Sequence, residues 1–310
     1  MFRKNILLIG KNGQLGRAFI KYSNILDKNF YKVSFIGRET LDLAVAGDKE
    51  YDEVFNYFQP SLVINTAAFT AVDKAELMKE LSLKVNGESL KIISNQCKKR
   101  EIPLIHFSTD YIFNGLGSLP WRINCKANPI NYYGETKLVG ENYIKKSGIK
   151  FIIFRVSWVF GYEGKNFVNT MINLSKKKEL KIVDDQYGGP TSAEYMANKV
   201  TKLIPSILSD RAPDNNLDEN FPWGVYHLQG KPIVSWYEFA DMIFKKSIEL
   251  KLFENAPRLI RTSTKEYKTT ASRPLNSILD CTETRLKLGI SQPLWEKDLK
   301  DYLIYTLSKR

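Results

Sequence analysis

Short apolar runs alternate with longer segments of helical pattern along the first half of the chain, and this alternation most constrains the fold. The runs occupy residues 5–9, 31–36, 62–68, 104–107 and 151–156. Apolar runs of this length, bounded by turn residues, are typical of strands that helices cover on both faces. A shorter run at 41–43 is expected to form one more strand, and the segment from about Asp73 to Arg100 is expected to form one long helix. The pattern therefore predicts the α/β class, with a doubly wound parallel sheet and right-handed connections.

The regular alternation weakens beyond about residue 160, where polar and glycine-rich loops separate the helical segments. We therefore expect a dinucleotide-binding domain at residues 1–156 and a smaller C-terminal α/β substrate lobe at 157–310, with some segments of the lobe returning to the first domain. Open α/β sheets bind ligands at the carboxyl ends of their strands. The lobe is expected to close over that edge.

A glycine loop, Gly10-Lys11-Asn12-Gly13-Gln14-Leu15-Gly16, joins the first strand to a helical pattern that continues through Tyr22. Glycines let a backbone approach closely, and free N–H groups at a helix start can bind a pyrophosphate. The spacing is G-x-x-G-x-x-G, so the loop supports a Rossmann-type sheet only together with the alternation around it. Small residues Ala67 and Ala68 close a later strand and would let a cofactor lie against it.

Arg38 follows the strand at 31–36. An arginine in this place accommodates a 2′-phosphate, whereas an acid holds a free ribose hydroxyl. The predicted cofactor is therefore NADPH, with NADH as the alternative. An ordinary surface arginine after a turn is the competing interpretation.

Candidate catalytic residues lie between Ile105 and Lys137. The apolar run ends in Ser108-Thr109-Asp110, and a helix expected to begin near Asn131 carries Tyr133 and Lys137. Residues four apart share one helix face. We expect the ammonium to lower the tyrosine pKa from about 10, so that Tyr133 can give a proton to a developing alkoxide. Thr109 would offer a second hydroxyl to the same oxygen.

The Tyr-x3-Lys spacing is weak by itself, because it recurs at Tyr195/Lys199 and Tyr305/Lys309. Those two pairs are interpreted as solvated helix faces. The upstream Ser-Thr-Asp and the N-terminal glycine loop distinguish the pair at 133 and 137.

Composition excludes several other classes of protein. No apolar run is long enough to cross a bilayer, and the N-terminus lacks a signal-peptide pattern, so a cytoplasmic location is expected. Three scattered cysteines and two histidines, His106 and His227, predict no metal site and no Ser-His-Asp triad. His106 is expected to be a packed core residue.

The net charge of +12 raises the question of nucleic acid. The lysine pairs, however, lie near the ends of expected helices, where cations are favourable with the helix dipole. We therefore predict no nucleic-acid and no membrane partner. A basic surface also suits an anionic nucleotide ligand.

Seven ordered motifs together resemble the extended short-chain dehydrogenase/reductase family over nearly the whole chain. They are G-x-x-G-Q-L-G at 10–16, N-T-A-A-F-T-A-V-D-K-A-E at 65–76, S-T-D-Y-I-F at 108–113, Y-G-E-T-K at 133–137, F-R-V-S-W-V-F at 154–160, D-Q-Y-G-G-P-T at 185–191 and A-S-R-P at 271–274. Within the family, the resemblance implies NAD(P)H-dependent reduction of the C4 keto group of dTDP-4-dehydro-L-rhamnose. The expected partner is therefore a nucleotide-sugar substrate.

The resemblance also implies roles for individual residues. Tyr133 would protonate the C4 oxygen, Thr109 would polarise the carbonyl, and Lys137 would also bond the nicotinamide ribose. Substrate contacts would come from Asp110 and Trp158. The implied cofactor contacts are Gly13, Gln14 and Leu15 at the pyrophosphate, Asp42 and Leu43 at the adenine, and Ala68, Phe69 and Thr70 along its length.

The sequence departs from the family pattern in two places. Phe69 stands where many relatives have histidine, and Ala18 stands where some have a glutamate of a metal-bridged dimer. A monomer or weak homodimer is therefore expected. Two alternatives stay open: a reductase of another nucleotide-linked 4-keto-6-deoxy sugar, and a non-catalytic, cofactor-binding regulatory subunit.

Overall fold

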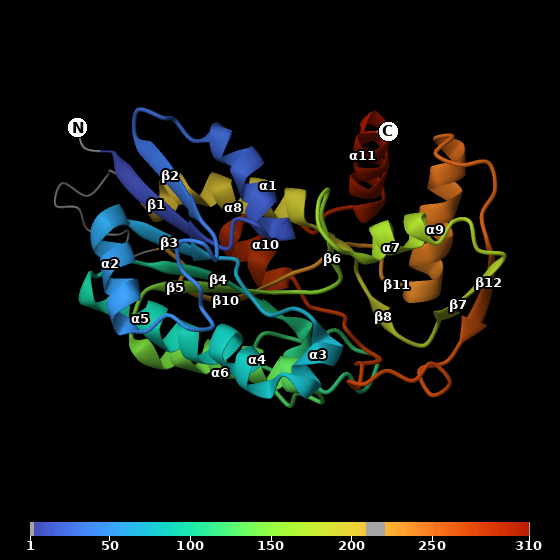
Figure 1. Cartoon of the computed structure of the whole chain (residues 1–310), viewed down its shortest axis with the longest axis horizontal. Helices are drawn as coiled ribbons and strands as arrows, with labels where there is room; N and C mark the ends of the chain where they lie inside the picture. Colours follow the sequence, from blue (N-terminus) through green and yellow to red (C-terminus); the bar gives the residue numbers. More distant parts are fainter. Residues whose placement is uncertain (1–2, 209–220, 310) are drawn as a thin grey trace.

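The computed structural model describes residues 3–208 and 221–309, and its centre is one parallel sheet (Figure 1). Within these ranges the sheet has six strands in the order β10-β5-β4-β3-β1-β2, and every neighbouring pair is parallel. The strands are β1 (Lys4–Ile9), β2 (Tyr31–Ile36), β3 (Leu62–Asn65), β4 (Leu104–Thr109), β5 (Phe151–Val156) and β10 (Gly224–Leu228).

Successive side chains of a strand point to opposite faces, so β1 contributes residues to two separate apolar cores. Ile6 and Leu8 pack with α1 (Gln14–Tyr22) and α8 (Ala193–Ile207) on one face. Leu7 and Ile9 pack on the other face, with α2 (Asp48–Phe58), α5 (Ser89–Lys99) and α6 (Tyr132–Ser147). Figure 1 shows these helices as layers above and below the sheet. The predicted doubly wound α/β fold is confirmed.

A second lobe follows β5 and has its own apolar core. This core is built by α7 (Phe167–Asn173), α9 (Trp236–Glu249) and α11 (Trp295–Ser308). Three short pairs of strands accompany it: β6 (Val159–Phe160) with β9 (Thr191–Ser192), β7 (Glu179–Val183) with β12 (Arg258–Thr262), and β8 (Tyr187–Gly188) with β11 (Val234–Ser235). Ser235 caps α9, since its hydroxyl accepts the Glu238 N–H at the start of the helix.

Three elements from the C-terminal half lie with the N-terminal sheet. α8 packs against α1, and β10 pairs with β5 as an edge strand. α10 (Thr282–Leu288) lies against β10. The chain therefore leaves the sheet after β5 and returns to it. A domain boundary at residue 156 stays a prediction.

Three local features of the structure differ from those predicted from the sequence. Residues 41–43 form no strand, because the Asp42 carboxylate accepts the Ala44 N–H and bends the chain into a turn. The strand expected at 62–68 ends at Asn65. The long helix expected near 73–100 is divided into α3 (Val72–Leu77), α4 (Lys79–Leu83), a π-helical turn at Lys84–Glu88, and α5.

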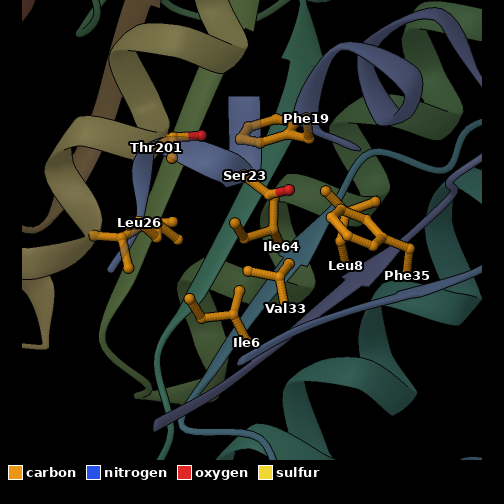
Figure 2. Close-up of a pocket in the computed structure, with 10 residues that line it drawn as sticks. Ile6, Leu8, Phe19, Ser23, Leu26, Val33, Phe35, Ile64 and Thr201 are labelled. Carbon is orange, nitrogen blue, oxygen red and sulfur yellow. The ribbon is translucent and has the colours of Figure 1, made fainter. Parts of the chain in front are cut away.

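A small cavity lies in the core between the sheet and the helices α1 and α8 (Figure 2). Its volume is about 10 Å³, so it holds no ligand. Apolar side chains line most of it, and the hydroxyl of Thr201 at its edge has no hydrogen-bond partner.

Candidate active site

The carboxyl end of β4 places two predicted site residues side by side. Thr109 ends the strand and caps a single 3-10 turn, Asp110–Ile112. Its hydroxyl accepts the Tyr111 N–H at 3.2 Å and donates to Asp110 Oδ1 at 3.0 Å. Both side chains are buried. The strand and the turn therefore fix the threonine hydroxyl before any ligand arrives.

Helix α6 supplies the tyrosine and the lysine. Asn131 caps it, as predicted, by accepting the Gly134 N–H at 2.8 Å. A Cβ on Gly134 would lie 2.1 Å from the Tyr111 carbonyl oxygen, so only glycine lets the helix approach the turn after β4. Tyr133 and Lys137 follow one turn apart, and both are buried.

The structure brings Tyr133 close to Thr109 and Asp110. Burial raises the pKa of Tyr133 well above its ordinary value, the nearby Thr109 hydroxyl opposes this, and Asp110 adds to it. The expected lowering of the Tyr133 pKa is therefore wrong. Desolvation dominates, and the side chain at neutral pH is a phenol that carries its proton.

Lys137 directs its side chain toward β4. Its Nζ donates to the Phe107 carbonyl at 2.7 Å and lies 3.1 Å from His106 Nε2. Burial lowers the pKa of Lys137 to about 8, while Glu141, one turn further along α6, raises it. Arg155 holds that glutamate with two hydrogen bonds, from Nε at 3.0 Å and Nη2 at 2.9 Å.

Asp110 is a carboxyl group in an unusual environment. Burial raises its pKa to about 6, although Ser277 and the Thr109 hydroxyl lower it. Among the described residues its Oδ2 has no hydrogen-bond partner. Buried carboxyls with a raised pKa are frequent at functional sites.

The glycine loop forms the close backbone turn that the sequence predicts. Gly10 has φ +99°, and a Cβ there would lie 2.5 Å from the Ala67 nitrogen. A Cβ on Gly16 would lie 2.1 Å from the Gly10 carbonyl oxygen. Gly13 begins α1 without a side-chain cap, and the first turn of the helix has no acid. The first N–H groups of α1 are thus suited to a phosphate anion.

Gln14 and Leu15 have different positions at this helix start. The Gln14 side chain is engaged with the second lobe, since its Oε1 accepts from Gly161 N at 2.9 Å and Asn166 Nδ2 at 3.0 Å. Leu15 is buried in the core below the loop. A pyrophosphate would therefore meet the backbone of these two residues.

The predicted adenine end of the site is more open. The Arg38 side chain is 83% exposed and lies 4.0 Å from Asp42, so it is free to turn toward a phosphate. Lys11 pairs with Glu39 at 2.6 Å. A cavity of about 320 Å³ begins at Leu43 and is lined also by Ala44, Val45, Ala46, Lys84, Glu88, Ser89 and Ile92.

The loop after β3 carries Ala67, Ala68, Phe69 and Thr70, and one buried amide holds it in place. Asn86 Oδ1 accepts the Phe69 N–H at 2.8 Å, and Asn86 Nδ2 donates to the Phe69 carbonyl at 3.1 Å. Asn86 lies in the π-helical turn, a feature that often marks functional sites. Thr70 at the end of the loop is exposed.

Trp158 follows β5 with φ +46°, a conformation that is rare for a large side chain. Its indole stacks on Trp236 with 3.5 Å between ring centroids and 10° between planes. Gly188 approaches the same ring, and a Cβ there would lie 2.7 Å from Trp158 Cε2. Trp158 is thus held as a rigid aromatic plate between the sheet and the second lobe.

The family model described as RmlD substrate binding domain matches residues 4–307. The chain belongs to this family. Its place within the extended short-chain dehydrogenases/reductases, which the motifs indicated, is confirmed.

Members of the RmlD family resemble the chain over nearly their whole length. A dTDP-4-dehydrorhamnose reductase from Aggregatibacter actinomycetemcomitans is 34% identical over 304 residues, which are 97% of this chain and 98% of that protein. A crystal structure of such a reductase from Clostridium acetobutylicum has a TM-score of 0.84 at 34% identity, covering 99% of this chain and 100% of that one. The reductase from Bacillus anthracis, solved in complex with NADP, has a TM-score of 0.85 at 30% identity, covering 98% and 99%.

Two departures from the RmlD-family pattern can now be located. Phe69 lies half-buried in the loop that Asn86 holds. Ala18 is buried in the core beside α8, where a surface metal ligand has no place. Among residues 3–208 and 221–309, no group of three or more His, Cys, Asp or Glu side chains could bind a metal ion.

Sequence reasoning missed several residues around the site. Asn86 holds the loop after β3, Trp236 stacks on Trp158, and His106 contacts Lys137. A buried asparagine in an otherwise helical pattern is a usable signal for the first. No local pattern indicates the other two, since their partners come from distant elements.

Proposed function

We propose that the protein is an NAD(P)H-dependent reductase that converts dTDP-4-dehydro-L-rhamnose to dTDP-L-rhamnose by reducing its C4 keto group. The observation that carries this proposal is the meeting of Thr109, at the end of β4, with Tyr133 and Lys137 of α6, all three of which are buried. The resemblance to dTDP-4-dehydrorhamnose reductases supports the substrate, and the NADP bound by the Bacillus anthracis reductase supports the cofactor.

NADPH supplies a hydride to the C4 carbon when it is bound. The backbone at Gly13, Gln14 and Leu15 would hold its pyrophosphate at the start of α1. Arg38 would bind the 2′-phosphate, which makes NADPH the proposed cofactor and NADH the alternative. Asp42 and Leu43 would flank the adenine, beside the cavity that begins at Leu43.

Tyr133 would deliver its phenolic proton to the C4 oxygen as negative charge develops there. The Tyr133 phenol carries its proton at neutral pH, so the proton is available when the C4 oxygen becomes basic. The Thr109 hydroxyl would polarise the carbonyl. Asp110 would bind a sugar hydroxyl, and the Trp158 ring would pack on the C–H face of the sugar.

The decisive assay follows NADPH oxidation with dTDP-4-dehydro-L-rhamnose generated in situ. Tyr133→Phe removes one oxygen and should lower kcat by about 10²- to 10⁴-fold, with little change in KM for NADPH. Tyr132→Phe is the matched control, because the neighbouring tyrosine is half-buried and its ring lies against Lys79. Equal activity in Tyr133→Phe and wild type would overturn the assigned proton donor.

The same assay separates the alternatives. Turnover only with another nucleotide-linked 4-keto-6-deoxy sugar would keep the chemistry and change the substrate. NADPH binding without turnover on any such sugar would favour a regulatory subunit.

Within the described residues, no helix is both long and apolar enough to cross a bilayer. A cytoplasmic location, a monomeric or weakly dimeric state, and the lack of a nucleic-acid partner remain predictions from the sequence.

A further inference from the structure

Lys137 lies at the end of a buried row of polar side chains that crosses the sheet from β3 to α6. Asn65 Nδ2 lies 3.2 Å from His106 Nδ1, and His106 Nε2 lies 3.1 Å from Lys137 Nζ. All three side chains are at most 1% exposed. Without water around them, each donor in the row must meet an acceptor.

The orientation of the Asn65 amide is fixed by the backbone. Its Oδ1 accepts the Ala67 N–H at 3.1 Å, so its Nδ2 is the atom that faces the histidine. An amide nitrogen only donates. His106 Nδ1 must therefore be the acceptor, and the single proton of the neutral ring is on Nε2. Burial, together with the nearby Lys137, lowers the pKa of His106 well below its ordinary value, so the ring stays neutral.

The Nε2–H of His106 then faces Lys137 Nζ. An ammonium group offers only donors, so two donors would meet there. A neutral amine resolves this conflict, because its lone pair accepts from His106 while one of its hydrogens is donated to the Phe107 carbonyl at 2.7 Å. These hydrogen bonds therefore favour the neutral amine of Lys137 over its ammonium form.

We propose that His106, held in its Nε2–H tautomer by Asn65, is a positioning residue that favours the neutral amine of Lys137 in the cofactor-free site, so that binding of an anionic dinucleotide is coupled to uptake of a proton by Lys137. This inference rests on the proposed function, since it takes the dinucleotide as the ligand.

The other charged groups around Lys137 leave this coupling intact. On α6, Glu141 raises the pKa of Lys137, but it is shared with Arg155 from β5 and with Lys145 at 2.6 Å. Tyr133 on the same helix is a neutral phenol, and Asp110, from the turn after β4, is a buried carboxyl that interacts with that phenol. The strand β3 presents only the neutral Asn65.

The direction of the pH dependence follows from the lysine. Its pKa in the free site is about 8, and a bound anion would raise it. Proton uptake on binding is therefore largest midway between the free pKa and the raised pKa of the bound state, well above pH 8. At pH 8.5 about three-quarters of a proton per bound cofactor is expected, and uptake fades below pH 7, where the free lysine is already charged.

The first test needs no cofactor. The chain has only two histidines, so nitrogen-15 labelling of histidine gives two ring systems, and His106→Gln assigns them. The expected signal of His106 at pH 9 is the Nε2–H tautomer. Asn65→Asp keeps the acceptor for Ala67 N–H but accepts from Nδ1–H, so it should switch the ring to the other tautomer. An Nδ1–H tautomer in the wild type overturns the proposal.

The second test measures protons taken up with NADPH, by calorimetry at pH 8.5 in two buffers of different ionisation enthalpy. Wild type and the exposed control Asn29→Asp should both take up about three-quarters of a proton, and Asn65→Asp less than about a quarter. Equal uptake in wild type and Asn65→Asp overturns the coupling. Absence of any NADPH binding refutes the proposed cofactor and this coupling together, whereas the tautomer experiment still decides the role of His106.

Discussion

Tyr133 illustrates how a single residue can match a motif and still differ from its expected chemistry. The i, i+4 relation to Lys137 is present, yet the lysine bonds Phe107 and His106, and burial raises the pKa of the phenol. Spacing predicts which side chains share a face. The balance between desolvation and charge depends on what covers that face, which the sequence does not contain.

Asp110 should make the stability of the protein depend on pH. Its pKa is about 6 in the folded chain and near 4 when unfolded, so the folded state binds the proton more tightly. The stabilising contribution is therefore complete below pH 4 and is lost as pH rises through 6, a difference of about 3 kcal/mol.

Asp110→Asn removes this titration and should be more stable than wild type at pH 7.5, while the two proteins converge near pH 4. Urea unfolding at both pH values measures the difference. A constant difference between the two proteins across this range would show that Asp110 is not the titrating group.

The buried hydroxyl of Thr201 should also lower the stability of the folded protein. Its hydroxyl is buried without a partner at the edge of the small cavity shown in Figure 2. Thr201→Val has the same shape and removes the unpaired polar group, so the free energy of unfolding should rise by about 1 kcal/mol. Thr201→Ser keeps the hydroxyl and loses a methyl group, and should be less stable than wild type. Thermal unfolding of both variants tests this order, and a less stable valine variant would contradict it.

At the scale of elements, an ion pair buried between α6 and β5 connects the catalytic helix to the sheet. Glu141 is fully buried, and Arg155 is 3% exposed. Glu141→Gln leaves the guanidinium without a counter-charge and should cost about 3–5 kcal/mol. The control is Glu135→Gln, an exposed site on the same helix.

A double variant shows how much of the destabilisation comes from the unpaired charge and how much from lost packing. Replacing both partners, by Glu141→Leu with Arg155→Met, removes the unpaired charge and should recover much of the stability. Chemical denaturation gives both values. A double variant no more stable than Glu141→Gln would mean that packing, rather than the unpaired charge, dominates.

The elements differ in how far the sequence could predict them. The stretch from β4 to α6 followed from local signals, because an apolar run, a Thr-Asp turn and the Asn131 cap act within a few residues. The break at Met78 and the π-helical turn did not, since the latter exists where Asn86 leaves the helical register to hold the loop after β3. The row from Asn65 to Lys137 joins β3, β4 and α6, so it exists only in the folded chain.

At the scale of the whole molecule, the net charge of +12 should attract an anionic cofactor. Salt screens such attraction beyond about 10 Å at 0.1 M. The KM for NADPH should therefore rise several-fold between about 20 and 300 mM NaCl, while kcat changes by less than about twofold. Steady-state kinetics at fixed pH measures both quantities. A KM that does not depend on salt would show that only short-range contacts bind the cofactor.

The return of the chain to the sheet has a consequence for biosynthesis. β10, the strand that covers the free edge of β5, belongs to residues 224–228 and is made only after the strands β6 to β9 and the helices α7 and α8. α8, which covers the apolar face of α1, is also made after β5. A nascent chain that has only just completed β5 therefore exposes a bare strand edge and an uncovered helix face, both of which favour aggregation. Nearly three-quarters of the polypeptide must leave the ribosome before this sheet can close, so the nascent chain carries these exposed surfaces through much of its synthesis.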